Sequence, residues 1–198
     1  MDKILNREFY LQNAEIAAKE LLGKYLVREY EGKKIVCKIV ETEAYIGPED
    51  KACHAYNNRC TERTKVMFEE GGKAYIYFIY GMYYCLNIVV EREGKPEAVL
   101  IRGVEPVENR EEIEKNRKIK SKKEQDLTNG PGKLCTALKI DKGLNGYDIT
   151  KKGELYIVEG ESAGDIKSTT RINIDYAEEY KDKHWRFYIK GNKFVSKE

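Results

Sequence analysis

KAYIYFIYGMYYCLNIVV, residues 73–90, is the stretch that decides the fold. Gly81 lies in its middle, and both flanks are rich in aromatic and β-branched residues, as in two strands that pair over a tight turn. We therefore predict a β-hairpin. A tyrosine at a solvent-facing turn is costly unless an apolar or π-faced surface meets it, so Tyr80 and Met82 at the tip indicate a wedge. The alternative is a tyrosine-rich hairpin that serves only the core.

The composition predicts one domain over residues 1–198, because a chain of this length can bury a stable core without disulfides. Lys and Arg number 36 against 34 Asp and Glu, so the net charge of +2 indicates no class of partner. The N-terminus has no apolar segment, and no run approaches the roughly 18 apolar residues of a membrane span. We expect a soluble, intracellular monomer.

The cysteines are odd in number and scattered, which indicates a reducing compartment and buried free thiols. They are Cys37, Cys53, Cys60, Cys85 and Cys135. A zinc site at Cys53, His54 and Cys60 would need a fourth ligand, and the spacing has neither of the usual half-sites. We therefore expect no metal.

Two elements precede the central hairpin. Residues 12–22 predict a packing helix with Ile16, Ala17 and Leu21 on its buried stripe, Asn13 as N-cap and Gly23 as its stop. Residues 25–30 and 34–45 alternate and are rich in Val, Ile and Tyr, so they predict a second hairpin around a turn at residues 31–33.

The second strand of that hairpin ends in candidate chemistry. Glu41, Glu43 and Tyr45 share one face because side chains alternate along a strand. This pattern places a carboxylate beside an aromatic ring where the strand opens into a loop, although ordinary solvent-facing glutamates would give the same pattern. His54 follows in that loop, where a histidine is more often a surface residue than a catalytic one.

An arginine interrupts the next apolar strand, residues 97–106. Arg102 lies among Val99, Ile101 and their neighbours, and an unpaired buried charge is too costly to keep. It must therefore reach water or meet a buried acid, for which Glu43 is a candidate.

Basic residues follow this strand. Residues 107–119 predict an exposed helix, and its tail carries Arg117, Lys118, Lys120, Lys122 and Lys123, either as a solvated segment or as a collector of phosphates. Gly130-Pro131-Gly132 then enters a short helix over 133–139 with Lys133 in its first turn, a possible phosphate site. The spacing is not that of a nucleotide P-loop, so we exclude ATP binding. Residues 154–160 predict a strand, and residues 170–191 predict further strand or loop.

Several long blocks, in order, resemble the alkyladenine (3-methyladenine) DNA glycosylase family. They are AKELLGKYLV, IVETEAYIGPEDKACH, IYGMYYCLNI, LIRGVEP, NGPGKLCTAL and RFYIKGNKFVS. The resemblance implies an enzyme that flips a damaged purine out of duplex DNA and hydrolyses its bond to deoxyribose. It also agrees with the α+β fold that many short strands and few helices predict, a curved and largely antiparallel sheet with flanking helices and a protruding hairpin.

The resemblance also implies the roles of individual residues. Glu43 would activate the attacking water, and Arg102 would hold that water and the glutamate. Tyr45, His54 and Tyr77 would enclose the flipped base, and Asn87 would disfavour the 2-amino group of normal guanine. Tyr80, with Met82 beside it, would fill the vacated stack, while Lys133, Lys122 and Lys123 would contact phosphates.

The chemistry fits these roles. Hydrolysis of an N-glycosidic bond passes through an oxocarbenium-like state, which a carboxylate stabilises while it serves as a base for water. A cationic alkylated purine gains from cation–π contact with tyrosines. We expect 3-methyladenine, 7-methylguanine, hypoxanthine or ethenoadenine as substrates, no cofactor, and no lyase activity because no lysine is placed as a nucleophile.

One geometric condition can be stated in advance. Tyr77 and Asn87 fall on the same face only if the hairpin loop has an odd number of residues or a bulge. Two other classes stay open: a nucleic-acid-binding module without chemistry, and a small-molecule hydrolase that uses Glu43 and His54 without DNA affinity.

Overall fold

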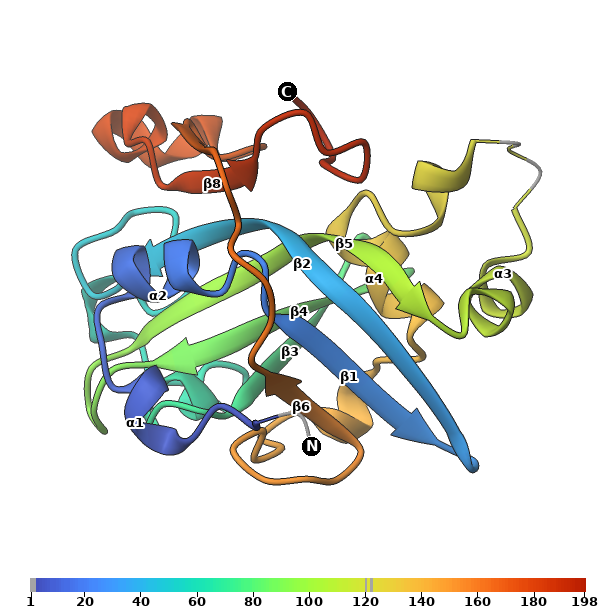
Figure 1. Ribbon diagram of the computed structural model, residues 1–198. Coiled ribbons are helices and arrows are strands. Elements are labelled where there is room, and N and C mark those ends of the chain that lie inside the picture. The colour runs from blue at the N-terminus through green and yellow to red at the C-terminus, as the bar shows by residue number, and fades with distance from the viewer. Residues whose placement is uncertain (1–2, 120, 122) are drawn as a thin grey trace.

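A 14-residue strand, β2 (Lys33–Ile46), runs through an open sheet whose order is β3-β4-β5-β2-β1-β6. The computed structural model describes residues 3–119, 121 and 123–198 (Figure 1). Every strand pairing among these residues is antiparallel, and β7 and β8 complete the eight strands. The predicted α+β class with a largely antiparallel sheet is confirmed.

The other strands are β1 (Tyr25–Tyr30), β3 (Ala74–Ile79), β4 (Tyr83–Val90), β5 (Glu97–Glu108), β6 (Leu155–Val158), β7 (Ile166–Thr169) and β8 (Arg186–Ile189). The α-helices are α1 (Arg7–Tyr10), α2 (Ala14–Glu20), α3 (Arg110–Arg117) and α4 (Pro131–Ala137). Short 3₁₀ helices are η1 (Tyr56–Asn58), η2 (Lys65–Phe68), η3 (Glu124–Leu127), η4 (Lys142–Leu144) and η5 (Asp175–Asp182). No helix among the described residues has the length and apolar character that crossing a bilayer requires.

The first hairpin turns at Glu31 and Gly32. Both have positive φ, 48° and 73°, as a two-residue type I′ turn requires, so β2 already begins at Lys33. The first half of β2 pairs with β1, and residues 41–43 pair with β8 along the same edge while β5 occupies the other edge. Glu41 and Glu43 therefore lie inside the sheet rather than at its border.

Helix α2 confirms the predicted cap and stop. Asn13 accepts a hydrogen bond from the Glu15 amide at 2.8 Å, and Gly23 follows with φ of 84°. Ile16 was wrongly placed on the buried stripe, since it is 51% exposed. Spacing explains the difference, because the residues that pack inward recur at i, i+3, i+4 and i+7. They are Ala14, Ala17, Ala18 and Leu21.

The two faces of the strands serve different purposes. Ile76, Leu86, Ile88 and Val99 belong to the main core, which also takes in the buried residues of α2 and α4. Their neighbours along each strand point the other way, since side chains alternate. That second face carries the site described below.

All three predicted helices differ from the observed ones at their ends, and α2 covers Ala14–Glu20 rather than residues 12–22. Strand β5 continues to Glu108, so α3 begins at Arg110 rather than at residue 107. Helix α4 begins at Pro131, whose fixed φ suits the first helical position, and ends at Ala137 rather than 139.

Candidate functional site

One row of residues across four strands brings the predicted site together. Tyr75 pairs with Asn87, Asn87 pairs with Leu100, and Leu100 pairs with Glu43. Directly paired residues share a face, so Glu43 and Asn87 lie on the same side of the sheet. The hairpin between β3 and β4 has a three-residue loop, residues 80–82, because Ile79 pairs with Tyr83. The odd loop that the pocket required is present, and Tyr77 lies on this face too.

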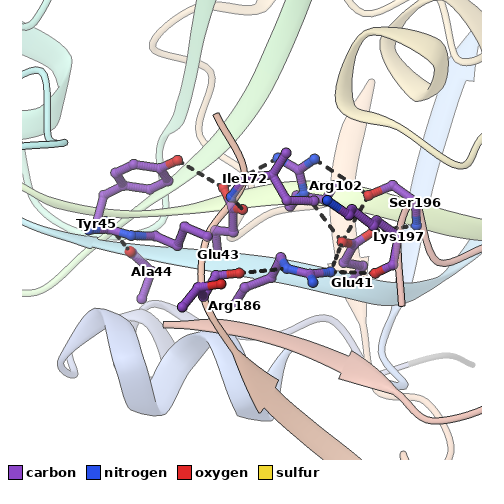
Figure 2. Close-up of polar contacts among 11 residues, drawn as sticks. Glu41, Glu43, Ala44, Tyr45, Arg102, Ile172, Arg186, Ser196 and Lys197 are labelled. Carbon is purple, nitrogen blue, oxygen red and sulfur yellow. Dashed lines mark hydrogen bonds and ion pairs between the residues drawn. The ribbon is translucent and has the colours of Figure 1, made fainter. Parts of the chain in front are cut away.

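Glu43 is fully buried and surrounded by donors (Figure 2). Its Oε2 accepts a hydrogen bond from the Tyr45 hydroxyl at 2.8 Å and lies 3.3 Å from Arg102 Nη1. Its Oε1 accepts from the backbone amide of Ile172 at 2.8 Å. An ionised carboxylate is an acceptor only, so these three donors match the charged form. The solvent-facing alternative for Glu41 and Glu43 is excluded, since both are 0% exposed.

The donors keep their protons. Burial and the neighbouring Glu43 raise the pKa of Tyr45 well above its usual value, so its hydroxyl donates across the physiological range. Burial acts to lower the pKa of Arg102, but Glu43 and Glu41 outweigh it and raise the pKa. Arg102 therefore does meet a buried acid, as its sequence context required, and it meets a second one in Glu41 at 3.3 Å.

A cavity of about 390 Å³ opens on this face, within the roughly 300–1,000 Å³ of small-molecule sites. Tyr45, His54, Tyr77, Asn87 and Arg102 all line it. The three donors to Glu43 come from residues of this lining, so the carboxylate lies directly beneath the surface that they form.

Aromatic rings make up one side of the cavity. The rings of His54 and Tyr77 meet edge to face with centroids 4.6 Å apart, and Tyr75 lies 5.6 Å from Tyr77. Asn87 is held in place because its amide donates to the Tyr75 carbonyl at 3.1 Å. The cavity thus presents flat π surfaces and one fixed amide, which suits a planar heterocycle.

His54 is a neutral lining residue rather than a loop surface residue. Burial, with a smaller effect from the Arg63 charge, lowers its pKa to about 4. Its Nδ1 lies 3.0 Å from the Tyr75 hydroxyl, and its Nε2 lies 3.5 Å from Arg63 Nη2. Because a guanidinium can only donate, this arrangement fits the tautomer with the proton on Nδ1.

This low pKa predicts a loss of stability on acidification. Between the unfolded value of 6.5 and the folded value of about 4, the unfolded chain binds a proton that the folded chain does not. The free energy of unfolding therefore falls as the pH drops through this window, by about 1–2 kcal/mol between pH 7 and pH 5. Urea unfolding should show this extra loss in the wild type and not in His54→Gln. A His54 ring that titrates near 6.5 by NMR would contradict the prediction.

The hairpin tip is exposed, as a wedge requires. Tyr80 is 73% exposed and Met82 64%, and Tyr80 lines the mouth of the cavity. Tyr80 has φ of +53°, in the left-handed region that non-glycine residues rarely adopt. The tip therefore holds an aromatic side chain in solvent on a strained backbone, a combination found at functional sites. The core-only alternative for this hairpin is wrong at its tip.

The predicted phosphate contacts are less well defined. Lys133 lies in the first turn of α4, but its Nζ contacts Asn129 at 2.7 Å and Asp126 at 3.3 Å. Lys123 is exposed, and Lys122 lies outside the described residues. Their roles stay predictions.

Sequence reasoning missed several residues of the site besides Tyr75 and Ile172. Arg171 forms a buried ion pair with Asp50, and its guanidinium lies over the Tyr45 ring at 4.7 Å. Arg63 lies over the Tyr77 ring at 5.2 Å, and Tyr176, 68% exposed, lines the cavity. The burial of Arg102 could be predicted because it interrupts an apolar strand. Arg171 lies in a polar stretch, so the sequence gives no such signal for its burial.

The five cysteines all lie among the described residues. No group of His, Cys, Asp and Glu suited to an ion occurs among residues 3–119, 121 and 123–198. All five thiols are free, and four are buried as expected, but Cys60 is exposed. Burial raises the pKa of Cys85, the thiol that lines the cavity, to about 11, so it stays protonated.

Comparisons with known proteins agree on one family. A sequence profile described as methylpurine-DNA glycosylase matches residues 8–193. A protein of Natranaerobius thermophilus is 52% identical over 97% of this chain and 98% of its own length. Proteins of Clostridium novyi and Clostridium botulinum are 53% and 54% identical over 98% of this chain and 99% of theirs. All three are provisionally named as 3-methyladenine DNA glycosylases.

Proposed function

This chain belongs to the methylpurine-DNA glycosylase family of base-excision repair enzymes, and from that premise we propose that it flips damaged purines out of duplex DNA and hydrolyses their N-glycosidic bonds to deoxyribose. We propose 3-methyladenine, 7-methylguanine, hypoxanthine and ethenoadenine as its substrates and an abasic site as its product. It would act as a monomer, as one domain over residues 1–198, in the compartment that holds the DNA.

One observation carries this proposal. A fully buried carboxylate, Glu43, lies beneath a cavity lined by rings, and the exposed Tyr80 stands at the mouth of the same cavity. A flipped base in the cavity would lie between the rings, and Tyr80 would reach into the duplex at the position that the base has left. The arrangement matches what base extrusion requires, a pocket for the base with an aromatic wedge at its mouth.

Glu43 is the proposed general base. When the bond between the purine and C1′ breaks, positive charge develops on the sugar, and a nearby carboxylate stabilises it. Water then attacks C1′ and gives its proton to Glu43, while the base leaves with the electrons of the glycosidic bond. Glu43 is fully buried and is not itself part of the cavity lining, so the water would reach it from the cavity past its donors Tyr45, Arg102 and Ile172. Arg102 and the Ile172 amide fix the carboxylate for this step.

We propose simple hydrolysis without lyase activity. A lyase step of the Schiff-base kind needs an amine that attacks C1′. No lysine lines the cavity in the described part of the chain, and the basic side chains there, Arg63 and Arg102, carry guanidinium groups, which are not nucleophiles.

Arg63 bears on the choice of lesion. Its guanidinium covers the Tyr77 ring, the surface that would attract a cationic purine. A charged lesion must therefore displace Arg63 or bind against other rings, whereas neutral hypoxanthine meets no charge repulsion. We propose that the cavity accepts both kinds of lesion and that Asn87 excludes normal guanine through its 2-amino group.

Tyr80→Ala should slow base release from duplex DNA by roughly 10- to 100-fold, because a stacked aromatic offsets a few kcal/mol of extrusion cost. Tyr80→Phe should keep most of the rate, since stacking needs the ring and not the hydroxyl. Single-turnover assays on a hypoxanthine duplex would measure this. Val107→Ala, which removes another exposed apolar side chain near the end of β5, is the control. Equal loss in the alanine and phenylalanine variants would count against stacking.

The function itself is tested on duplexes that carry each lesion. We expect base release and alkali-sensitive abasic sites from the damaged duplexes and none from a normal one. Lesion-selective binding with no base release would support a binding module instead. No DNA affinity, and no weakening of binding as salt rises, would support the small-molecule hydrolase.

A further inference from the structure

The C-terminal tail, residues 194–198, lies against the strands that carry the site. Phe194 and Val195 are buried and pack with Val40 and Tyr188, and in Figure 1 the C-terminus lies beside β8. Gly103 permits this approach, since a Cβ there would lie 2.7 Å from the Phe194 carbonyl oxygen. The tail therefore packs closely against β5 at Gly103, the residue after Arg102.

Ser196 binds Glu41 twice. Its amide donates to Glu41 Oε2 at 2.7 Å, and its hydroxyl donates to Oε1 at 2.9 Å (Figure 2). The same hydroxyl oxygen lies 3.4 Å from Arg102 Nη2, from which it can accept. Ser196 thus bridges a buried carboxylate and the arginine of the site.

Glu41 in turn holds two arginines. Its Oε1 lies 2.8 Å from Arg186 Nη1 and 3.3 Å from Arg102 Nε. Arg186 also donates to the Lys197 carbonyl at 2.7 Å, which ties β8 to the tail. Arg102 is therefore held between Glu41 and Glu43, each at 3.3 Å, and its orientation depends on both.

We propose that the C-terminal tail completes the active site: Ser196 positions Glu41, and Glu41 positions Arg102 against Glu43. This inference rests on the proposed function, because it concerns the same catalytic carboxylate. Ser196 and Glu41 are positioning residues that act through Arg102 and need not touch DNA. A shift of Arg102 relative to Glu43 would change the geometry at this general base, where small displacements have large effects on rate.

The contacts separate positioning from stability. Without the Ser196 hydroxyl, Glu41 keeps two arginines and the Ser196 amide, so no buried charge is left unpaired. The fold should therefore tolerate the change. Arg102 keeps both carboxylates but loses the 3.4 Å hydrogen bond from its Nη2 to the Ser196 hydroxyl, so its orientation is less tightly fixed.

The test compares Ser196→Ala with Ser196→Thr, which keeps a hydroxyl, and with Ser168→Ala on the exposed β7. Base release is measured at saturating enzyme in single turnover, and affinity is measured on a duplex with a stable abasic-site analogue. We expect Ser196→Ala to slow base release about tenfold while its affinity and unfolding midpoint stay near wild type. Threonine should restore the rate to within about threefold, and Ser168→Ala should match wild type.

Glu41→Gln is the second variant, and it should slow base release by about a hundredfold because it removes the charge itself. A wild-type rate in Ser196→Ala would overturn the inference, as would equal losses of rate and affinity or a threonine variant as slow as alanine. Should Glu41→Gln fail to fold, the serine variants still decide. A wild-type protein that releases no base would instead refute the proposed function.

Discussion

Glu43→Gln should lower base release about a thousandfold, while the protein still folds and still binds damaged duplex DNA. Glutamine keeps the shape of the side chain but is neutral and does not accept a proton from water. The variant therefore loses both the stabilisation of the sugar cation and the general base, which typically contributes about 10²–10⁴-fold.

The local contacts indicate that Glu43→Gln remains folded. The amide oxygen can accept from Arg102 and Tyr45, and then the NH₂ group faces the Ile172 amide, so one hydrogen bond is lost. Such a loss costs about 1–3 kcal/mol, less than the stability of a typical domain. Arg102 still has Glu41 as a partner.

Single-turnover release from a hypoxanthine or 3-methyladenine duplex measures the effect. Glu93→Gln is the matched control, because Glu93 is exposed in the turn between β4 and β5. Affinity for an abasic-site analogue should change little in either variant. If Glu43→Gln kept base release within about tenfold of wild type, another group would have to activate the water.

The sequence predicted those parts of the site that lie within one strand or hairpin. Tyr45 two residues after Glu43, and Tyr80 at a turn, are local patterns, and both residues lie where these patterns indicated. The contact of Arg102 with a buried acid was predicted from the energetic cost of burying its charge without a partner in an apolar strand. Strand pairing then decided which acid it meets, and it meets two.

The remainder depends on pairing between distant segments. Glu41 looked like any alternating strand residue, and only the packing of β8 and the C-terminal tail makes it a buried junction. Likewise, Asp50 and Arg171 come from loops, which have no periodicity to indicate burial. Ile16 shows the opposite error, because its hydrophobicity suggested burial at a position that the helical spacing leaves exposed.

Asp50→Ala should destabilise the protein by about 3–5 kcal/mol, because it leaves the Arg171 charge buried without its partner. Both side chains are 0% exposed, and the guanidinium contacts the two carboxylate oxygens at 2.5 and 2.8 Å. Burial acts to lower the pKa of Arg171, but Asp50 outweighs it and raises the pKa, so the charge persists. Asp50 also accepts from the Ala52 amide, which the variant leaves unpaired.

Asp50→Ala should lower the activity as well as the stability of the protein. Arg171 directly precedes Ile172, whose amide donates to Glu43, and the guanidinium lies over Tyr45. Base release should therefore fall at temperatures where Asp50→Ala is still folded. Urea unfolding measures the stability, with Asp165→Asn as the control because Asp165 is exposed.

A double variant separates two effects of Asp50→Ala: the buried Arg171 charge that is left without a partner, and the lost packing of the Asp50 side chain. Arg171→Met with Asp50→Ala removes both charges, so it should be more stable than Asp50→Ala alone, since a buried pair often costs more in desolvation than it returns. Its base release should stay low, because the methionine cannot donate to the Ala44 carbonyl that Arg171 holds at 3.0 Å. If the double variant were no more stable than Asp50→Ala, the lost packing of Asp50, rather than the unpaired Arg171 charge, would account for the loss of stability.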